Sequence, residues 1–333
     1  MSLAYSLDGA PVWDTEIAGF RSTDLPILRR EGVYGLAMLL PYRPDRVPVV
    51  MVHGTASSPA RWAELANELL GDPELAARCQ LWYFTYNTGQ PIAISASKLR
   101  EDLRNAVAAL DPTGSDEALR HMVVVGHSQG GLLTKLTAVS SGDAFWQQLS
   151  DEPFDQLDME PATRELIRGA LFVEPLPFVE RLIFIATPHR GSFLSMGIIG
   201  RIGSWLVESP ANLTKSIGDV MRRNPDLKAN RKLKDFKVPT AVDNMREDNP
   251  FLRTLVSLPI TPGVTAHSII PVATSGPIAD GDDRVVEYKS AHLDGVASEL
   301  VVRSGHSTQA EPATIEEVRR ILHEHLRSVD RSR

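Results

Sequence analysis

Short apolar runs rich in β-branched residues recur along the chain. A continuous apolar run of four to eight residues is typical of a strand that is buried on both faces of a sheet. The runs lie at 47–52, 81–85, 122–125, 182–186, 267–272 and 300–303. We therefore expect six buried strands.

The segments between these runs have helical periodicity. Apolar residues recur every three or four positions in 59–70 and in 97–110. Thr314, followed by Ile315, Glu316 and Glu317, has the form of a capping box, which predicts that a last helix begins there. The alternation of strands and helices predicts an α/β fold, in which a mainly parallel central sheet carries helices on both faces.

Two stretches, 141–180 and 191–261, interrupt this alternation and are longer than any connection requires. Such stretches are usually functional lids or insertions, so we expect helical lid or cap insertions there. The second contains an apolar stripe interleaved with glycines, namely Phe193, Leu194, Ile198, Ile199, Ile202, Trp205 and Leu206 with Gly197, Gly200 and Gly203. Two interpretations stay open, a core helix packed closely through its glycines and a mobile lid over an apolar pocket.

Repeats and linkers are absent from the sequence, because proline and glycine are scattered rather than pooled. Residues 1–333 are therefore expected to form a single domain that carries the two insertions. Of these residues 43% are hydrophobic and 23% are charged, which is ordinary for a soluble globular protein. The net charge of −7 argues against nucleic acid as a partner.

Further classes of protein are excluded by single features. The lone cysteine, Cys79, rules out an intramolecular disulfide and a zinc site built from several thiolates. No apolar run approaches the ~18 to 20 residues of a membrane span, so no transmembrane segment is expected. The first residues lack the basic region and apolar stretch of a signal peptide, which predicts a cytoplasmic location, or an envelope or secreted one if a leader has been removed.

The segment 121–136, HMVVVGHSQGGLLTKL, is the most informative about chemistry. It places a G-x-S-x-G sequence between a buried strand and a helical pattern, which is the context of a nucleophile elbow. Ser128 is the predicted nucleophile, and Gly126 and Gly130 leave room for so tight a turn. The following helix would present its N-terminal N–H groups to a developing anion. A structural turn without chemistry is the less favoured interpretation.

A serine hydroxyl needs a base, and both the base and its orienting acid should follow strands further along the chain. Seven of the nine histidines belong to predicted strands, to turns near the elbow, to the last helix or to a position after proline. His292 and His306 remain. His306 is preferred because it directly follows the strand at 300–303 and precedes the final helix, and His292 is the reserve.

The orienting acid is sought after the strand at 267–272, where Asp280, Asp282 and Asp283 occur. Asp283 begins an Asp-x-hydrophobic-Val pattern that commonly follows the penultimate strand of such enzymes. Asp283 is therefore preferred and Asp282 is second. The alternatives are solvated turn carboxylates and a calcium loop, although the segment lacks the spacing and terminal Glu of a recognised loop.

Two backbone N–H groups should stabilise the anion that forms during acyl transfer. One belongs to the residue after the nucleophile, Gln129, and the other to the turn after an early strand. His53 and Gly54 end that strand, which places the N–H of Thr55 in position. Losing one such donor costs ~2.7 to 4 kcal/mol of transition-state stabilisation. A His-Gly turn in an unrelated fold is the competing interpretation.

From Pro48 to Leu326 the chain resembles the α/β-hydrolase superfamily, and within it bacterial lipase- and esterase-like proteins. The resemblance rests on VHGT, GHSQGG, WYFTYNTGQPI, IFIATPHRGS and SAHLDGVASELVVRSGHS, stretches similar to those of a largely uncharacterised group in which some members carry lipoprotein leaders. It implies the catalytic triad Ser128, Asp283 and His306, with Thr55 and Gln129 in the oxyanion hole. Members often carry an apolar residue where this chain has Thr55 and methionine where it has Gln129.

These observations predict a serine carboxylic-ester hydrolase, a carboxylesterase or lipase that works through an acyl-enzyme. Its substrates would be small-molecule, lipid or polymeric esters, including polyesters. No cofactor or metal is implied, because Walker A, GxGxxG and HExxH motifs are lacking. The alternatives are an acyltransferase or thioesterase with the same triad, and a non-catalytic binding protein on the same fold. The oligomeric state is not predicted.

Overall fold

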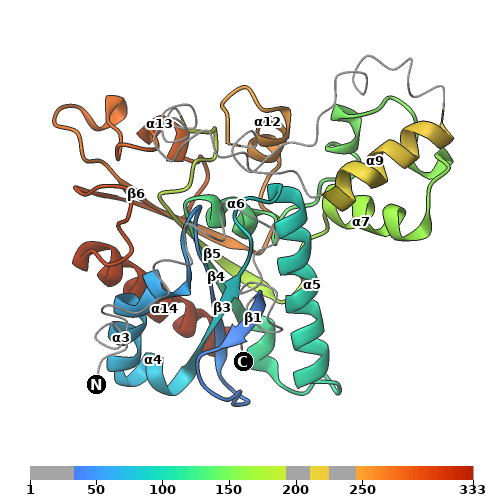
Figure 1. Ribbon diagram of the computed structural model, residues 1–333. Helices are drawn as coiled ribbons and strands as arrows, with labels where there is room; N and C mark the ends of the chain where they lie inside the picture. The colour runs from blue at the N-terminus through green and yellow to red at the C-terminus, as the bar shows by residue number, and fades with distance from the viewer. Residues whose placement is uncertain (1–33, 193–210, 225–244, 333) are drawn as a thin grey trace.

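The computed structural model describes residues 34–192, 211–224 and 245–332, and its centre is a seven-stranded sheet (Figure 1). The strands are β1 Gly35–Met38, β2 Val47–Val52, β3 Cys79–Thr85, β4 Met122–His127, β5 Val179–Ile185, β6 Thr265–Pro271 and β7 Ser298–Val302. Their order is β1-β3-β2-β4-β5-β6-β7. All neighbouring pairs are parallel except β1 with β3, so the predicted, mainly parallel sheet is confirmed.

All six predicted strands are present, and the structure adds β1 at one edge. This four-residue strand was not predicted. It pairs antiparallel with β3, with Gly35 opposite Thr85 and Met38 opposite Trp82. The strand β4 extends two residues beyond its apolar run, because Gly126 and His127 continue its pairing with β5.

Helices cover both faces of the sheet, as predicted. On one face lie α5 Ile92–Leu110 and α6 Gln129–Lys135, and on the other lie α3 Ala63–Gly71, α4 Pro73–Arg78 and α14 Pro312–Ser332 (Figure 1). The remaining helices are α7 Pro161–Leu171, α9 Ala211–Arg223, α12 Pro250–Ser257 and α13 Tyr288–Ala291. Short 3₁₀ turns are η1 Pro59–Trp62, η2 Glu117–His121, η3 Trp146–Gln148, η4 Phe154–Gln156 and η7 Ile278–Asp280.

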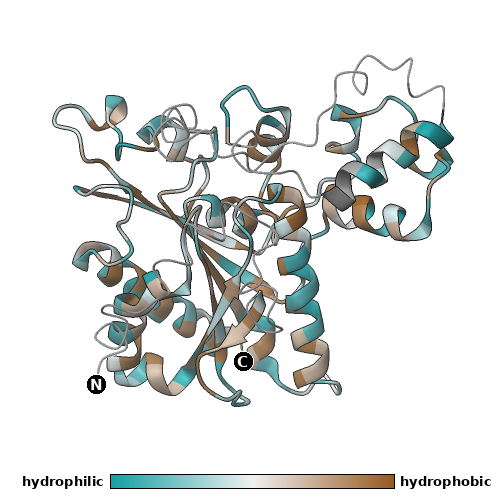
Figure 2. Cartoon of the chain, in the orientation of Figure 1, coloured by the Kyte–Doolittle hydropathy of each residue, from teal (hydrophilic) through white to brown (hydrophobic). Residues whose placement is uncertain are grey.

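The alternation of side chains along each strand divides the core into two layers. In β2, Val50 and Val52 pack with the α5 layer, whereas Val49 and Met51 pack with the α3 and α14 layer. Period-two alternation is what a strand dictates, and here both faces are apolar because both are covered. Figure 2 shows the strands mostly in brown, with teal concentrated on peripheral helices and loops. Within the described residues, no helix is both long enough and apolar enough to span a bilayer.

Two predicted helix boundaries differ in the structure. The last helix begins at Pro312, not at Thr314, so the predicted capping box does not open it. Proline is favoured in the first helical turn, and the buried Thr314 hydroxyl lies 3.1 Å from the Thr308 hydroxyl. The predicted helix at 59–70 is divided into η1, whose first turn is capped by the side chain of Ser58, and α3.

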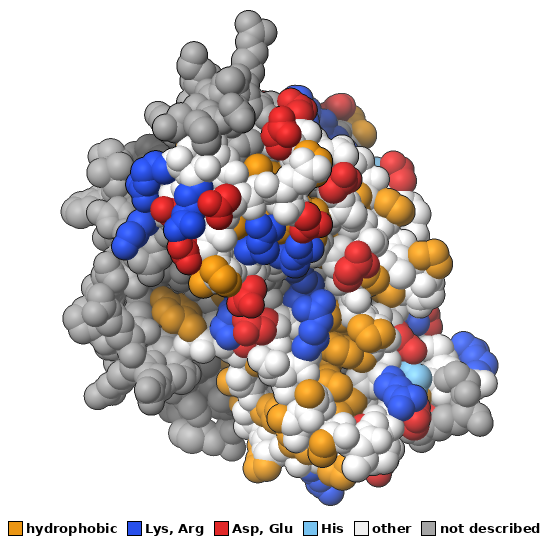
Figure 3. All heavy atoms as spheres, turned by 90° about the vertical axis from the view of Figure 1, so that its right-hand side faces the viewer, with side chains coloured by type: hydrophobic (Ala, Val, Ile, Leu, Met, Phe, Trp, Pro, Cys, Tyr) orange, Lys and Arg blue, Asp and Glu red, His pale blue; other side chains and the backbone are white. Residues whose placement is uncertain are grey.

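The two insertion ranges pack against each other. A small apolar cluster of their residues consists of Trp146, Phe154, Leu157, Met159 and Val220. Asp158 and Asn224 join the ranges by two hydrogen bonds of 2.8 and 2.7 Å. Figure 3 shows basic and acidic side chains interspersed on the face that carries α7 and α9. The glycine-interleaved apolar stripe predicted at 193–206 lies outside the described residues.

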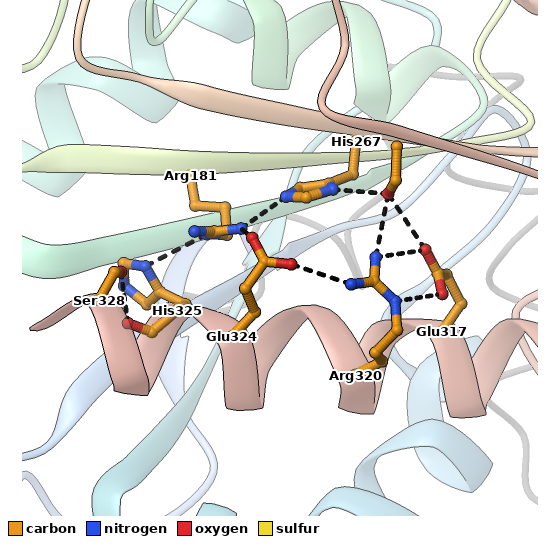
Figure 4. Close-up of polar contacts among 8 residues, drawn as sticks. Arg181, His267, Glu317, Arg320, Glu324, His325 and Ser328 are labelled. Carbon is orange, nitrogen blue, oxygen red and sulfur yellow. Dashed lines mark hydrogen bonds and ion pairs between the residues drawn. The ribbon is translucent and has the colours of Figure 1, made fainter.

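A buried polar network joins β5 and β6 to α14 near the N-terminal ends of the strands (Figure 4). Arg181 donates hydrogen bonds to His267 Nε2 (2.6 Å) and His325 Nδ1 (3.3 Å) and pairs with Glu324 at 2.9 Å. His267 Nδ1 lies 2.7 Å from the Ser298 hydroxyl. The network satisfies a buried guanidinium and fixes α14 on the sheet, at the end opposite to the predicted site.

Candidate active site

Ser128 lies on a sharp turn between β4 and α6. Its backbone has φ 53° and ψ −125°, a conformation that L-residues rarely adopt. Neighbouring hydrogen bonds hold this strained residue, since the Ser128 N–H donates to the Ile185 carbonyl (2.8 Å) and the Gly131 N–H donates to the Ser128 carbonyl (2.9 Å). The geometry is that of the predicted elbow.

Glycines around Ser128 are required by the close approach of the backbone. A Cβ atom on Gly126 would lie 2.5 Å from the Gly130 carbonyl oxygen, and one on Gly130 would lie 2.3 Å from the Val52 carbonyl oxygen. The contact at Gly131 is closest, because a Cβ atom there would lie 1.8 Å from Thr187 Oγ1. The first turn of α6 is therefore pressed against both β2 and the loop after β5.

The structure brings the side chains of Ser128, His306 and Asp283 together. His306 Nε2 lies 2.9 Å from Ser128 Oγ, and His306 Nδ1 lies 2.7 Å from Asp283 Oδ2. An ionised carboxylate only accepts hydrogen bonds, so Nδ1 carries the proton and Nε2 is free to accept one from the serine hydroxyl. Three loops, after β4, β6 and β7, supply the three residues.

The Asp283 carboxylate is almost fully buried, with 1% of its side chain exposed. Its Oδ1 accepts hydrogen bonds from the N–H groups of Val285 (2.8 Å) and Val286 (2.7 Å), which compensate for its loss of water. The loop that carries it is fastened to the loop after β5, because Ser192 Oγ donates to the Val285 carbonyl and Arg190 donates to the Lys289 carbonyl. The carboxylate is thereby held at one distance from His306.

The reserve candidates have other partners. Asp282 Oδ1 accepts a hydrogen bond from the Arg284 N–H at 2.7 Å. His292 Nδ1 lies 2.6 Å from Glu299, whose second oxygen accepts from Tyr288.

Among the residues that the structure describes, no group of three or more His, Cys, Asp or Glu side chains could hold a metal ion.

The turn after β2 runs beside the start of α6. Within the described parts of the chain, neither the Thr55 N–H nor the Gln129 N–H has a hydrogen-bond acceptor. Their side chains are joined, since Thr55 Oγ1 donates to Gln129 Oε1 at 2.6 Å. Gln129 Nε2 reaches the Thr88 carbonyl at 3.4 Å, and Thr88 Oγ1 accepts from the Ala56 N–H at 3.1 Å.

Two buried histidines flank this arrangement and were not singled out from the sequence. His53 Nδ1 donates to the Gly54 carbonyl (3.0 Å) and its Nε2 accepts from the Tyr86 N–H (3.4 Å); burial lowers its pKa to about 4. His127 Nε2 lies 2.9 Å from the His306 carbonyl oxygen. The position of His127 next to the nucleophile was its only sequence signal, because His306 is 179 residues away.

Similar solved structures support the fold. The Bacillus licheniformis lipase BlEst2 in its mature form is 15% identical, with 86% of this chain and 97% of that chain covered and a TM-score of 0.50. The Staphylococcus hyicus lipase is 14% identical, with 89% and 99% covered and a TM-score of 0.51. At such identities the likeness concerns the fold alone.

No match to the chain was found among the curated proteins. A family model described as "Alpha/beta hydrolase family" matches residues 49–318, from within β2 into the start of α14. The turn at Ser128, the strand order and this match agree with one another. The chain therefore belongs to the alpha/beta hydrolase family.

Proposed function

We propose that the protein is a serine carboxylic-ester hydrolase in which Ser128 is the nucleophile, His306 the base and Asp283 the orienting acid. The observation that carries the proposal is the unbroken series of hydrogen bonds from Ser128 Oγ to His306 (2.9 Å) and from His306 to Asp283 (2.7 Å). A nucleophile and a base within hydrogen-bond reach, with the base oriented by a third group, are what nucleophilic catalysis requires.

In the first half of the reaction, His306 Nε2 takes the proton of Ser128 as Oγ bonds to the carbonyl carbon of the ester. The carbonyl oxygen becomes an anion, which the N–H groups of Thr55 and Gln129 stabilise. The C–O bond to the alcohol then breaks, and the leaving oxygen receives the proton from His306. This sequence leaves an acyl group on Ser128.

In the second half, His306 takes a proton from water, whose oxygen attacks the acyl carbon. The bond to Ser128 Oγ breaks, and Oγ recovers the proton from His306. The carboxylic acid leaves and the resting state returns. Asp283 stabilises the positive charge that His306 carries in both halves, and it holds the ring in the tautomer that this exchange needs.

The proposal includes one hydrolase domain with cap insertions at about 141–180 and 191–261, which would form the acyl-binding region. Support comes from Met245, a residue of the second insertion whose Sδ lies 3.7 Å from Thr55 Oγ1. Its backbone carbonyl accepts from the Ser192 N–H at 2.8 Å, which anchors the Met245 backbone beside the predicted oxyanion turn. An apolar side chain there favours acyl esters of modest length or more, including lipid and polymeric esters.

The test is hydrolysis of p-nitrophenyl esters from acetate to palmitate by the parent protein and by Ser128→Ala. Ser115→Ala, at an exposed turn, is the matched control. We expect the first variant to lose activity and fluorophosphonate labelling, and the second to keep both. The parent could instead be labelled yet hydrolyse no ester, and transfer acyl groups to an alcohol or cleave thioesters. The activity would then be acyl transfer or thioester hydrolysis in place of ester hydrolysis. An unlabelled, inactive parent would overturn the proposal.

A further inference from the structure

His127 is the residue before the nucleophile, at the end of β4, and its ring is buried with 4% of the residue exposed. Its Nε2 lies 2.9 Å from the backbone carbonyl oxygen of His306. A carbonyl only accepts hydrogen bonds, so His127 carries its proton on Nε2 and donates it. The nucleophile's own strand is thereby bonded to the loop of the base.

The ring of His127 is closely surrounded. The Trp62 ring meets it edge-on at 6.5 Å between centroids, and the His306 ring lies 5.1 Å away. On its other side, a Cβ atom on Gly54 would lie only 3.0 Å from His127 Nδ1. The ring therefore fills the space between the turn that carries Thr55 and the loop that carries His306.

The ring is also neutral. Burial, and then the proximity of His306, lowers the pKa of His127 to about 3, and the charge of Arg61 acts in the same direction. Protonation of Nδ1 would place a cation where no described group accepts a hydrogen bond from it. His127 consequently stays uncharged while His306 gains and loses its proton.

The carbonyl of His306 accepts a second hydrogen bond, from the Thr308 N–H at 3.0 Å. That contact is internal to the loop after β7 and moves with it. The contact from His127 is different, because it comes from the strand that carries Ser128. The contact from His127 therefore helps to set the distance between Ser128 Oγ and His306 Nε2. The contact from Thr308 does not affect that distance.

We propose that His127 is a positioning residue, whose hydrogen bond to the His306 carbonyl holds the base at attacking distance from Ser128. The inference rests on the proposed function, since it assigns His306 the role of base. His127 touches neither the substrate nor the transferred proton. Its loss should therefore lower kcat and leave KM nearly unchanged.

The decisive variants are His127→Phe, which keeps a ring without a donor, and His127→Gln, whose amide can offer an N–H at similar reach. The chain provides a matched control in His325, another buried histidine, whose Nε2 lies 2.7 Å from the His121 carbonyl on the α14 side of the sheet. The same two substitutions at His325 remove the same kind of contact far from Ser128, and they also remove the hydrogen bond that His325 Nδ1 accepts from Arg181.

We expect His127→Phe to lower kcat by about fivefold or more, the equivalent of one neutral hydrogen bond, with KM within about twofold. Fluorophosphonate labelling of Ser128 should slow in parallel, and His127→Gln should recover a large part of both rates. His325→Phe should lower the melting temperature without changing kcat. These readouts separate positioning from a general loss of stability.

A kcat for His127→Phe within about twofold of the parent, or an equal loss in His325→Phe, would overturn the inference. If His127→Phe does not fold, His127→Asn replaces it, because its shorter amide does not reach the carbonyl and Gln then serves as the rescue. A parent that is neither labelled nor active contradicts the proposed function. An active parent with unaffected His127 variants contradicts this inference alone.

Discussion

Thr55 and Gln129 are joined by a hydrogen bond of 2.6 Å between their side chains. Thr55 lies in the turn after β2 and Gln129 begins α6, yet their backbone N–H groups are the two proposed donors to the oxyanion. Here a directional contact joins the two donors, and the fully buried Gln129 extends it to the Thr88 carbonyl.

Replacing either partner should therefore weaken catalysis by loosening the spacing of the two N–H groups. We expect Thr55→Val and Gln129→Met each to lower kcat by roughly fivefold, since a neutral hydrogen bond contributes about 1 kcal/mol. Thr55→Ser, which keeps the hydroxyl, is the control. The double variant should cost less than the product of the single losses, as a double-mutant cycle measures. Strictly multiplicative losses would show that the contact does not couple the two positions.

Asp283 and Asp282 are adjacent candidates that the structure distinguishes by their partners. Asp283→Asn should lower kcat by about 10³- to 10⁴-fold, because an amide favours the wrong tautomer of the base. Asp282→Asn should change kcat by no more than a few-fold, since its carboxylate accepts from the Arg284 N–H instead. Steady-state kinetics on one p-nitrophenyl ester compare them. A larger effect at Asp282 would transfer the role to that residue.

Gly131 and Gly218 both lie in helices, but only Gly131 is packed closely against another segment, at Thr187. A Cβ atom on Gly131 would lie 1.8 Å from Thr187 Oγ1, whereas one on Gly218 would meet no atom of the described residues within 4 Å. Gly131→Ala should lower the free energy of unfolding by about 3 kcal/mol, as overpacking does. Gly218→Ala should raise it by up to ~1 kcal/mol through helix propensity. Urea unfolding measures both, and Thr187→Ala should restore part of the loss in Gly131→Ala.

The free energy of unfolding should decrease as the pH is lowered, because several buried histidines are neutral in the folded chain. Burial lowers the pKa of His53, His267 and His325 to about 4 and that of His127 to about 3. An unfolded histidine titrates near ~6.5, so the unfolded chain binds more protons below that pH. This contribution is complete above about pH 6.5 and is lost as the pH falls toward 4.

The urea midpoint should therefore decrease steadily from pH 7 to pH 4.5. Each pKa unit corresponds to about 1.4 kcal/mol, so the loss in the free energy of unfolding is on the order of a few kcal/mol for each of these histidines. His325→Gln removes one of these groups and should flatten the dependence. A midpoint independent of pH in this window would contradict the assignment of neutral buried rings.

Much of the sheet was predictable because each central strand is apolar on both faces. The run VPVVMV coincides with β2 residue for residue. The strand β1 has no such signature, since GLAM is short, only partly buried and depends on pairing with β3, more than forty residues away. Likewise, Thr314 had the sequence of a cap, but its hydroxyl is engaged by Thr308, and Pro312 begins the helix.

The candidate site likewise has a part that the sequence predicts and a part that it does not. Ser128 was predictable because its turn demands glycines at fixed positions, and the loops after the last two strands confined the choice of base and acid. The contact of His127 with His306 and that of Thr55 with Gln129 depend on how segments distant in the sequence meet in the fold. No local pattern encodes such a contact, so it emerged only from the three-dimensional structure.

The crowding around Gly126, Gly130 and Gly131 also limits which substitutions this protein can accept. A side chain at any of these positions would collide with backbone or with Thr187, so the reacting end of the molecule tolerates little change. The apolar cluster of Trp146, Phe154, Leu157, Met159 and Val220 is separate from the two core layers that pack on the sheet, so we expect substitutions there to disturb Ser128 less. Engineering for a new substrate should accordingly begin in that cluster and leave the nucleophile turn untouched.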